Sequence, residues 1–440
     1  MIRSIYSLLA IAAQPFVRRK LRRRGVAEPG YLVAVGERFG EYTGTAEPGA
    51  IWIHAVSLGE TRAAAILIEQ LRRMQPGVRI LLTHGTATGR AEGQRLLRPG
   101  DAQAWLPWDT PKAVWRFLNQ FQPAVGILME TEVWPNLVAE CKARGLPLAL
   151  ANARLSAKSL AQTLRLRSLS RPAYASLTAV WAQTEADAQR LAEAGATVKG
   201  VFGNLKFDAT PDAAQLELGR AWRAAVREPI VMFASSREGE EAELFRVLKA
   251  GRELERAGFA RRDADRVLPQ VHWLVVPRHP QRFDEVASLA VSEGFNVSRR
   301  SQWSHAPDAC EVWIGDSLGE MALYYGLSDV ALLGGSFEKL GGQNLIEAAA
   351  SGCPLVMGPH TFNFAEAAQL AEESGAAKRV QAIDEAVRAA VMLAADEGKR
   401  DAMAQAAVKF AAAHQGAARK TAQAVADLAA KTLSPSSPAG

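Results

Sequence analysis

The sequence predicts an α/β fold made of two doubly wound domains, each with a parallel sheet covered by helices. Short apolar runs alternate with helical stretches along most of the 440 residues, and this alternation is typical of parallel sheets. The alternating pattern occurs twice, in halves of similar size that a polar helical stretch before Pro229 separates. We therefore expect two domains that face each other across a cleft.

Shifts in composition along the chain predict where the domains begin and end. We expect an N-terminal segment at residues 1–25, a first domain at 26–210, a linker at 211–228 and a second domain at 229–433. Alanine-rich helices from Asp384 onward are expected to close the second domain. Residues 434–440 are small and polar, which is typical of a disordered tail.

Each predicted strand is a short apolar run bounded by glycine, proline or polar residues. In the first half the predicted strands are Ile51–Ala55, Val78–Leu82, a run ending at Trp105, Ala124–Met129, Leu146–Ala151, Leu177–Gln183 and Val198–Phe202. In the second half they are Ile230–Ala234, Val271–Val276, Val312–Ile314, Val330–Leu333 and Pro354–Met357. The first long helix after a strand is expected to begin at Glu60 and to reach about Met74.

The stretch from Val330 to Pro359 has the pattern of a phosphate-binding unit. The apolar run Val330–Leu333 ends at Gly334 and Gly335, and Asn344 is a good N-cap for a helix through Ala350. Glycines at a strand end let backbone N–H groups approach a ligand closely, and a helix N-terminus favours an anion. The alternative is an ordinary βαβ unit whose glycines only shape turns, because no G-x-G-x-x-G or Walker pattern is present.

Polar clusters follow several of the predicted strands, where the ligands of open parallel sheets bind. These clusters are Ser57–Glu60, Glu130–Glu132, Asn152–Arg154, Gly203–Lys206, Ser235–Glu240, Pro277–His279 and the glycine turn at 334–335. Because the clusters occur in both halves, we expect them to line the cleft from both sides.

The net charge indicates which kinds of binding partner suit the protein, and the cysteine content indicates the redox state of its compartment. The formal net charge is +6, which suits an anionic partner such as a nucleotide, a phospholipid surface or a nucleic acid. Three cysteines, Cys141, Cys310 and Cys353, lie far apart. They form neither a disulfide framework nor a zinc-ligand set, which indicates a reducing compartment.

The N-terminal segment is expected to associate with a membrane surface. Ile5–Ala13 is apolar but shorter than the roughly 20 residues that a spanning helix needs. A dense basic run follows, consisting of Arg18, Arg19, Lys20, Arg22, Arg23 and Arg24. A secretory signal ending near Ala12 is opposed by positive charge on its C-terminal side. We favour an amphipathic anchor on anionic head groups over a helix packed only on the protein itself.

Taken together, the motifs resemble those of the 3-deoxy-D-manno-octulosonic acid (Kdo) transferases, a family of GT-B glycosyltransferases. The matching motifs are Glu37–Gly40, Trp52–Glu60, Glu130–Pro135, Asn152–Ser156, Gly203–Phe207, Pro277–Pro280, Leu318–Glu320 and Gly334–Glu347. The ordered series covers the whole chain and is specific, whereas each motif alone is weak. The resemblance implies two Rossmann-like domains with an interdomain cleft.

The same resemblance implies transfer of Kdo from CMP-Kdo to the glucosamine disaccharide of a lipid A precursor (lipid IVA). This family works at the cytoplasmic face of the bacterial inner membrane and needs no bound metal or other cofactor. We thus expect lipopolysaccharide biosynthesis as the role, with CMP-Kdo, a lipid A precursor and an anionic membrane surface as partners. Nucleic acid is not expected, because aromatic residues are not interleaved with the basic run.

By this resemblance the catalytic residues are Glu60, Glu130 and Lys206. Glu60 matches the family's base, which takes the proton of the acceptor hydroxyl. Glu130 and Lys206 match positions that support an oxocarbenium-like transition state. The alternatives from local sequence are a first-turn glutamate for Glu60, an ion pair with Arg154 for Glu130 and a solvated lysine for Lys206.

Residues of the second half resemble the donor site. The stretches matched to CMP binding are Pro277, Arg278, Leu318, Gly319, Glu320, Asn344, Leu345, Ile346 and Glu347. Further candidate donor contacts are Ser57, Gly59, Arg237, His279, Gly334, Gly335, Ser336 and Gln343. Two positions depart from the family pattern, since Gln343 and Arg237 stand where histidine is usual. We expect altered donor contacts there and retained activity.

Other functions are less consistent with the sequence. Asp263-Ala264-Asp265 is a D-x-D tripeptide, but it lies among arginines before a strand, so we interpret it as a solvated loop and expect no metal. A UDP-sugar 2-epimerase shares the two-domain architecture but needs no lipid acceptor or anchor. A non-catalytic membrane scaffold is opposed by the presence of Glu60, Glu130 and Lys206.

Overall fold

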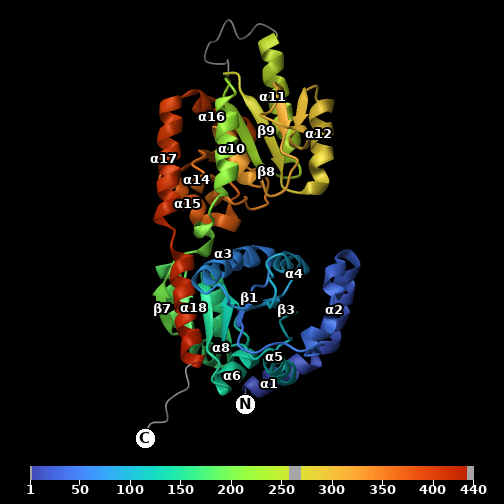
Figure 1. The fold of residues 1–440 in the computed structure, drawn as a ribbon, viewed down its shortest axis with the longest axis vertical. Coiled ribbons are helices and arrows are strands. Elements are labelled where there is room, and N and C mark those ends of the chain that lie inside the picture. Colours follow the sequence, from blue (N-terminus) through green and yellow to red (C-terminus); the bar gives the residue numbers. More distant parts are fainter. Residues whose placement is uncertain (1, 257–268, 434–440) are drawn as a thin grey trace. The chain divides into compact units, whose positions relative to one another are not determined.

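The computed structural model describes residues 2–256 and 269–433, and the chain divides into two compact units (Figure 1). Unit 1 contains the residues through Asp208 together with those from His414 onward, and unit 2 contains Ala209–Ala413. Each unit has its own sheet and its own hydrophobic core.

Unit 1 is built on seven parallel strands in the order β3-β2-β1-β4-β5-β6-β7. The strands are β1 (Ile51–His54), β2 (Ile80–His84), β3 (Ala102–Trp105), β4 (Val125–Met129), β5 (Leu148–Ala153), β6 (Ala179–Ala182) and β7 (Val198–Val201). The helices are α1 (Ile2–Ala12), α2 (Gln14–Ala27), α3 (Leu58–Met74), α4 (Ala87–Gln94), α5 (Pro111–Phe121), α6 (Pro135–Ala143), α7 (Ala157–Arg165), α8 (Arg167–Ala175), α9 (Glu185–Ala194) and α18 (Ala417–Leu433).

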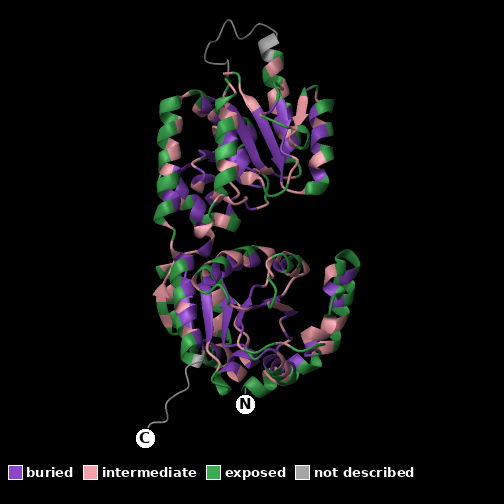
Figure 2. Cartoon of the chain, in the orientation of Figure 1, coloured by how far each residue is buried: buried purple, intermediate pink, exposed green. Residues whose placement is uncertain are grey.

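The sheet of unit 1 is apolar on both faces because helices cover both. One face packs against α3 and α18 around Ile53, Leu67 and Val425, and the other packs against α5 and α6 around Trp52 and Phe117. Figure 2 shows the buried strands and the helices with a buried side and an exposed side. This arrangement explains why the strands are continuous apolar runs.

Unit 2 has seven parallel strands in the order β10-β11-β9-β8-β12-β13-β14. They are β8 (Ile230–Ser236), β9 (His272–Pro277), β10 (Val297–Arg299), β11 (Val312–Ile314), β12 (Val330–Leu333), β13 (Leu355–Met357) and β14 (Ala377–Arg379). The helices are α10 (Ala213–Ala224), α11 (Glu240–Arg256), α12 (Phe283–Ser292), α13 (Met321–Leu327), α14 (Leu345–Ala350), α15 (Ala365–Glu373), α16 (Ile383–Ala395) and α17 (Glu397–Ala413).

The predicted fold class is confirmed, and the sequence missed only short edge strands. β10 and β14 have three residues each and include charged side chains, so neither forms an apolar run. Both lie at the edges of their sheet, where the outer side needs no apolar cover.

The expected linker at residues 211–228 is a helix of unit 2. α10 packs closely on α13 because both carry glycine at the contact. A Cβ at Gly219 would lie 2.1 Å from the carbonyl oxygen of Leu323, and one at Gly326 would lie 2.5 Å from that of Leu216. The stretch therefore belongs to the packed domain despite its polar composition.

The C-terminal helix also differs from the expected domain bounds. α18 was expected to close the second domain, but it packs against α3 in unit 1 through Ala418, Ala422 and Val425. The Asp208 carboxylate accepts hydrogen bonds from the N–H groups of Gly416 (2.5 Å) and Ala418 (2.8 Å). The chain thus returns to unit 1 after leaving it at Asp208, which an alanine-rich sequence alone does not reveal.

Helix α1 is held on unit 1 by one side and is exposed on the other. The buried Asp109 carboxylate accepts hydrogen bonds from the Tyr6 hydroxyl (2.9 Å) and from the N–H of Leu137 (2.8 Å). The Trp108 indole donates to the carbonyl of Ala10 (2.8 Å). Leu8 and Leu9 remain 67% and 65% exposed. Among the described residues, no helix has the length and apolar content to cross a bilayer.

We predict that Asp208→Ala loosens α18, because the start of this helix loses two hydrogen bonds to a carboxylate. The loss should be about 1–2 kcal/mol, as for other side-chain caps. Hydrogen exchange of the α18 amides and the urea midpoint measure it. Asp208→Asn keeps one acceptor oxygen, so its urea midpoint should lie between those of the parent and Asp208→Ala. Hydrogen exchange in Asp208→Ala as slow as in the parent would contradict this role of Asp208.

Candidate functional site

The candidate sites lie where the strand order reverses in each sheet. In unit 1 the reversal is between β1 and β4, and in unit 2 it is between β8 and β12. The segments that leave adjacent strands at such a point turn to opposite faces and leave a crevice for a ligand. Glu60 follows β1, Glu130 follows β4, Arg237 follows β8 and Gly334 follows β12.

Glu60 lies in the first turn of α3, although the helix begins two residues earlier than expected. Ser57 is the N-cap, and its hydroxyl accepts a hydrogen bond from the Glu60 N–H. The Glu60 carboxylate accepts bonds from the Val56 N–H (2.9 Å) and the Ser57 hydroxyl (2.9 Å). This is close to a capping box, so the side chain has the structural role that the sequence left open.

The surroundings of Glu60 also suit proton transfer. Burial raises the pKa of Glu60, and the carboxylates of Glu130 and Glu132 raise it further, while the bond from the Val56 N–H opposes both effects. A carboxylate has about four acceptor positions, so its two hydrogen bonds leave capacity for a substrate hydroxyl. The structure therefore allows Glu60 to cap the helix and to accept a proton.

Glu130 is a buried carboxylate shared by two cations. It is 6% exposed, and it pairs with Arg154 (Nε to Oε2, 2.9 Å) and Lys206 (Nζ to Oε1, 3.7 Å). Its backbone is left-handed, with φ of 59°, which costs of order 1 kcal/mol for a residue with a Cβ. The ion pair with Arg154 is thus present, and Lys206 is not merely a solvated lysine.

Asn152 connects the end of β5 to the segment that carries Lys206. Its side-chain oxygen accepts a hydrogen bond from the Leu205 N–H (3.0 Å), next to Lys206. Asn152 is buried and left-handed, with φ of 51°, a conformation that asparagine tolerates better than most residues. The sequence placed Asn152 in a motif without giving it this positioning role.

In unit 2, a buried glutamate holds the glycine turn after β12. The Glu240 carboxylate accepts hydrogen bonds from the N–H groups of Arg237 (2.9 Å), Gly335 (2.8 Å) and Phe337 (3.1 Å). Gly334 approaches β8 so closely that a Cβ would lie 2.2 Å from the carbonyl oxygen of Ser235. Glu240 belongs to one of the polar clusters that follow the predicted strands, but the sequence pattern alone does not show that it supports this turn.

Several basic side chains lie beside the same turn. The Arg278 guanidinium donates to the side-chain oxygen of Gln343 (3.1 Å), and Gln343 Nε2 lies 3.1 Å from where a Cβ would stand at Gly335. Arg237 Cγ lies 3.5 Å from that same point. Partial burial lowers the pKa of His279, and the charges of Arg237 and Arg278 lower it further. These surroundings favour an anion.

The helix after this turn presents its N-terminus as predicted. Asn344 caps α14, and its side-chain oxygen accepts a hydrogen bond from the Ile346 N–H (3.1 Å). Leu345 and Ile346 are fully buried in the core, so only their backbone groups are available to a ligand. Glu347 lies in the first turn and is partly exposed.

The remaining donor candidates differ in how free their side chains are. Leu318 is 68% exposed, while Glu320 is bound by Arg300 (2.7 Å) and by the Ser317 hydroxyl. The Ser336 hydroxyl is buried between the Leu333 carbonyl (2.5 Å) and the Gly358 N–H (2.8 Å). Ser336 therefore supports the turn, and Pro277, the last residue of β9, is also buried.

Metal binding has no candidate site in the part of the chain that the structure describes, since no three His, Cys, Asp or Glu residues are placed to hold an ion. The Asp263-Ala264-Asp265 tripeptide lies outside the described residues.

Glu132 is a further carboxylate near Glu60, and burial raises the pKa of Glu132.

Comparison with known proteins identifies the family. Residues 34–209 match the family model described as 3-deoxy-D-manno-octulosonic-acid transferase. The 3-deoxy-D-manno-octulosonic acid transferase of Bordetella pertussis is 45% identical over 97% of this chain and 99% of its own length. The chain belongs to the Kdo transferase family. It is therefore a glycosyltransferase, as the motifs predicted.

Solved structures agree on the fold and do not by themselves distinguish functions. MurG of Acinetobacter baumannii has a TM-score of 0.53 at 15% identity, over 87% of this chain and 100% of that one. The UDP-GlcNAc 2-epimerase of Neisseria meningitidis has a TM-score of 0.52 at 12% identity, over 87% of this chain and 100% of that one. Because both levels of identity are low, the family assignment depends on the sequence relationship and not on these likenesses.

We predict that Glu240→Ala destabilises unit 2 by about 2–4 kcal/mol, since three backbone N–H groups lose their common acceptor in a buried place. The denaturant midpoint measures the change. Glu243→Ala is the matched control on α11, because the Glu243 side chain is 43% exposed and pairs with Arg246 of the same helix. If the two variants were equally stable, Glu240 would not support the glycine turn.

Proposed function

We propose that the protein transfers Kdo from CMP-Kdo to the glucosamine disaccharide of a lipid A precursor, with Glu60 as the general base. The single observation that carries the proposal is the relationship to the Bordetella pertussis enzyme over 97% of the chain. The positions of Glu60 and Glu130 at the strand reversal of unit 1 support it, as does the ion pair that Lys206 forms with Glu130. The name of that relative gives the sugar, and the acceptor is our inference from the family.

In the proposed step an acceptor hydroxyl attacks the anomeric carbon of Kdo. The new glycosidic bond forms as the bond from that carbon to the CMP phosphate oxygen breaks, and the hydroxyl proton passes to the Glu60 carboxylate. A raised pKa makes the Glu60 carboxylate a stronger base than that of an ordinary glutamate. No metal ion is required for this proton transfer.

Glu130 and Lys206 are proposed to support the charge that develops as CMP departs. The sugar becomes electron-poor, and fixed charges nearby stabilise such a distribution without reorganising. Lys206 and Arg154 are held by one buried carboxylate, so one of them can turn toward the Kdo carboxylate while the other still neutralises Glu130.

Unit 2 is proposed to hold the nucleotide part of the donor. Arg278, Arg237 and His279 offer positive charge and donors to the phosphate, and Gly334, Gly335 and the start of α14 offer backbone N–H groups. The Gln343 amide replaces the histidine usual in the family and keeps Arg278 in place by a hydrogen bond. By resemblance to the family, we propose that Leu318–Glu320 face the nucleotide and that Glu347 binds the ribose.

The N-terminal helices are proposed to bind the cytoplasmic face of the bacterial inner membrane. Ile5, Leu8, Leu9 and Phe16 are large, apolar and exposed on α1 and α2. The basic residues of α2 follow directly in the chain. Exposed apolar side chains next to lysines and arginines are typical of helices that lie in an anionic interface.

The proposal predicts that Glu60→Gln lowers kcat by about 10²–10⁴-fold, because an amide cannot take the acceptor proton. Transfer of Kdo from CMP-Kdo to lipid IVA in detergent, followed by mass spectrometry of the products, measures it. Glu69→Gln is the matched control, since Glu69 is half-exposed on the same helix. A Glu60→Gln enzyme that works at the parent rate would overturn the assignment of the base.

We also predict the direction of the pH dependence. The base works only when ionised, so kcat should fall as the pH falls through the pKa of Glu60. Since burial raises this pKa, the acidic limb of the profile should lie above the value of an ordinary glutamate. An acidic limb at or below that ordinary value would argue against a buried glutamate base.

A further inference from the structure

Unit 1 carries a basic groove along α8 that the proposed chemistry does not use. One hollow is lined by Arg165, Arg167, Ser168, Arg171, Pro172 and Ala175. A second hollow, of about 290 Å³, shares Ser168 and Pro172 and is also lined by Arg3 of α1 and Lys142 of α6. The two hollows therefore adjoin along the exposed side of α8, and no acidic residue of the described chain lines either one.

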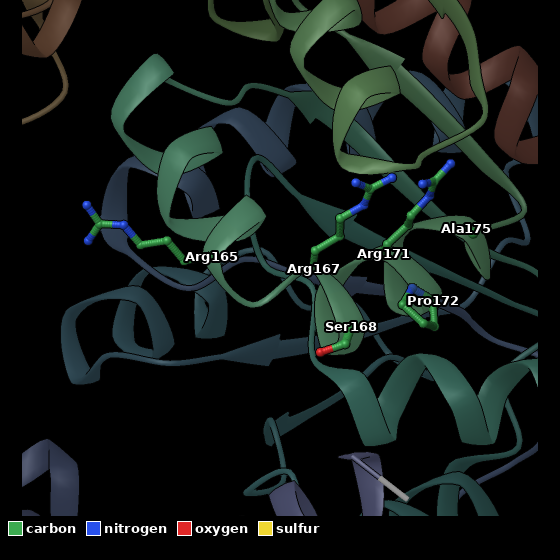
Figure 3. A pocket seen from close by; sticks show the side chains of 6 residues that line it. All are labelled: Arg165, Arg167, Ser168, Arg171, Pro172 and Ala175. Carbon is green, nitrogen blue, oxygen red and sulfur yellow. The ribbon is translucent and has the colours of Figure 1, made fainter.

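Two arginines of this groove carry like charge at adjacent turns of one helix. Figure 3 shows the Arg167 and Arg171 side chains extending to the same side of α8, as their spacing of four residues requires. Like charges at this spacing repel and weaken a helix. Neither forms an ion pair with a described residue, whereas the neighbouring Arg144 pairs with Glu140 at 2.8 Å. The unpaired charges are thus available to an external anion.

Exposed apolar side chains occur beside Arg167 and on the neighbouring helix α1. Leu166 lies between Arg165 and Arg167 at the turn from α7 to α8 and is 63% exposed. α1 packs against α6 and α8, and it carries the exposed Leu8 and Leu9 beyond Arg3. A soluble anion needs no such apolar border, whereas a lipid presents a phosphate and acyl chains together.

We propose that the α8 groove is a binding site for the headgroup phosphate of anionic glycerophospholipids. The phosphate lies between the guanidinium groups of Arg167 and Arg171, which suit its oxygens by charge and fork geometry. Arg3 and Lys142 attract the headgroups of neighbouring lipids, and the Leu166 side chain contacts the acyl chains. This deepens the proposed membrane association, because it adds a lipid contact on α8 that is remote in sequence from the basic run of α2.

The test is flotation of the full chain with phosphatidylcholine vesicles that contain or lack phosphatidylglycerol. Arg167→Glu/Arg171→Glu should bind the anionic vesicles at least tenfold more weakly, since each basic side chain near such a surface contributes several-fold in affinity. The difference should shrink at high salt. Binding to pure phosphatidylcholine should be equal for the variant and the parent.

The matched control is Arg419→Glu/Lys420→Glu, which changes the net charge equally. Both residues are exposed on α18, which packs on the sheet face opposite to α6. The control should bind within about twofold of the parent. The proposal is overturned if the control loses as much affinity as the α8 variant, or if the α8 variant keeps the parent affinity. Equal thermal unfolding of both variants shows that they fold.

An activity measurement separates this site from the proposed transfer. With acceptor in neutral detergent, the α8 variant should keep the parent kcat and the parent KM for the lipid A precursor. A higher KM there would mean that the groove binds the phosphates of the acceptor, which overturns the membrane-lipid proposal. If the parent itself transferred no Kdo, the proposed function would fail while the vesicle result still decides the role of the groove.

Discussion

The whole arrangement depends on one constraint, the reversal of strand order at the centre of each parallel sheet. Every strand pair in both sheets is parallel, so all strands of a sheet end at the same edge. At the reversal the chain leaves neighbouring strands toward opposite faces, and the gap exposes strand ends that would otherwise be covered. Glu60 and Glu130 flank this gap in unit 1, and Arg237 and Gly334 flank it in unit 2.

Buried carboxylates hold the segments that follow these strands in both units. Glu240 gathers three backbone N–H groups around the glycine turn, and Glu130 gathers two cations while its own backbone is left-handed. A buried charge is costly unless it is paired or hydrogen-bonded, so each carboxylate fixes its partners. Glu60 is also largely buried, and this burial raises its pKa. The packing of the site is thus linked to its proposed chemistry.

Sequence reasoning was most successful where the pattern is local. Alternating apolar runs predicted both sheets, and Asn344 predicted the start of α14 to the residue. Prediction from the sequence failed where contacts join segments that are distant along the chain. The alanine-rich C-terminus does not show that α18 returns to Asp208, and a polar stretch does not show the close contact at Gly219. The support from Glu240 depends on three segments meeting in space, so no spacing rule reveals it.

The central claim is that the two strand reversals have separate tasks, chemistry in unit 1 and donor binding in unit 2. Calorimetric titration of CMP into the full-length protein tests this most directly. The account predicts that Glu60→Gln binds CMP as the parent does, whereas Arg278→Ala binds it at least tenfold more weakly through loss of a charge-assisted contact. If Glu60→Gln lost CMP affinity as Arg278→Ala did, or if Arg278→Ala kept it, the division of tasks would be wrong.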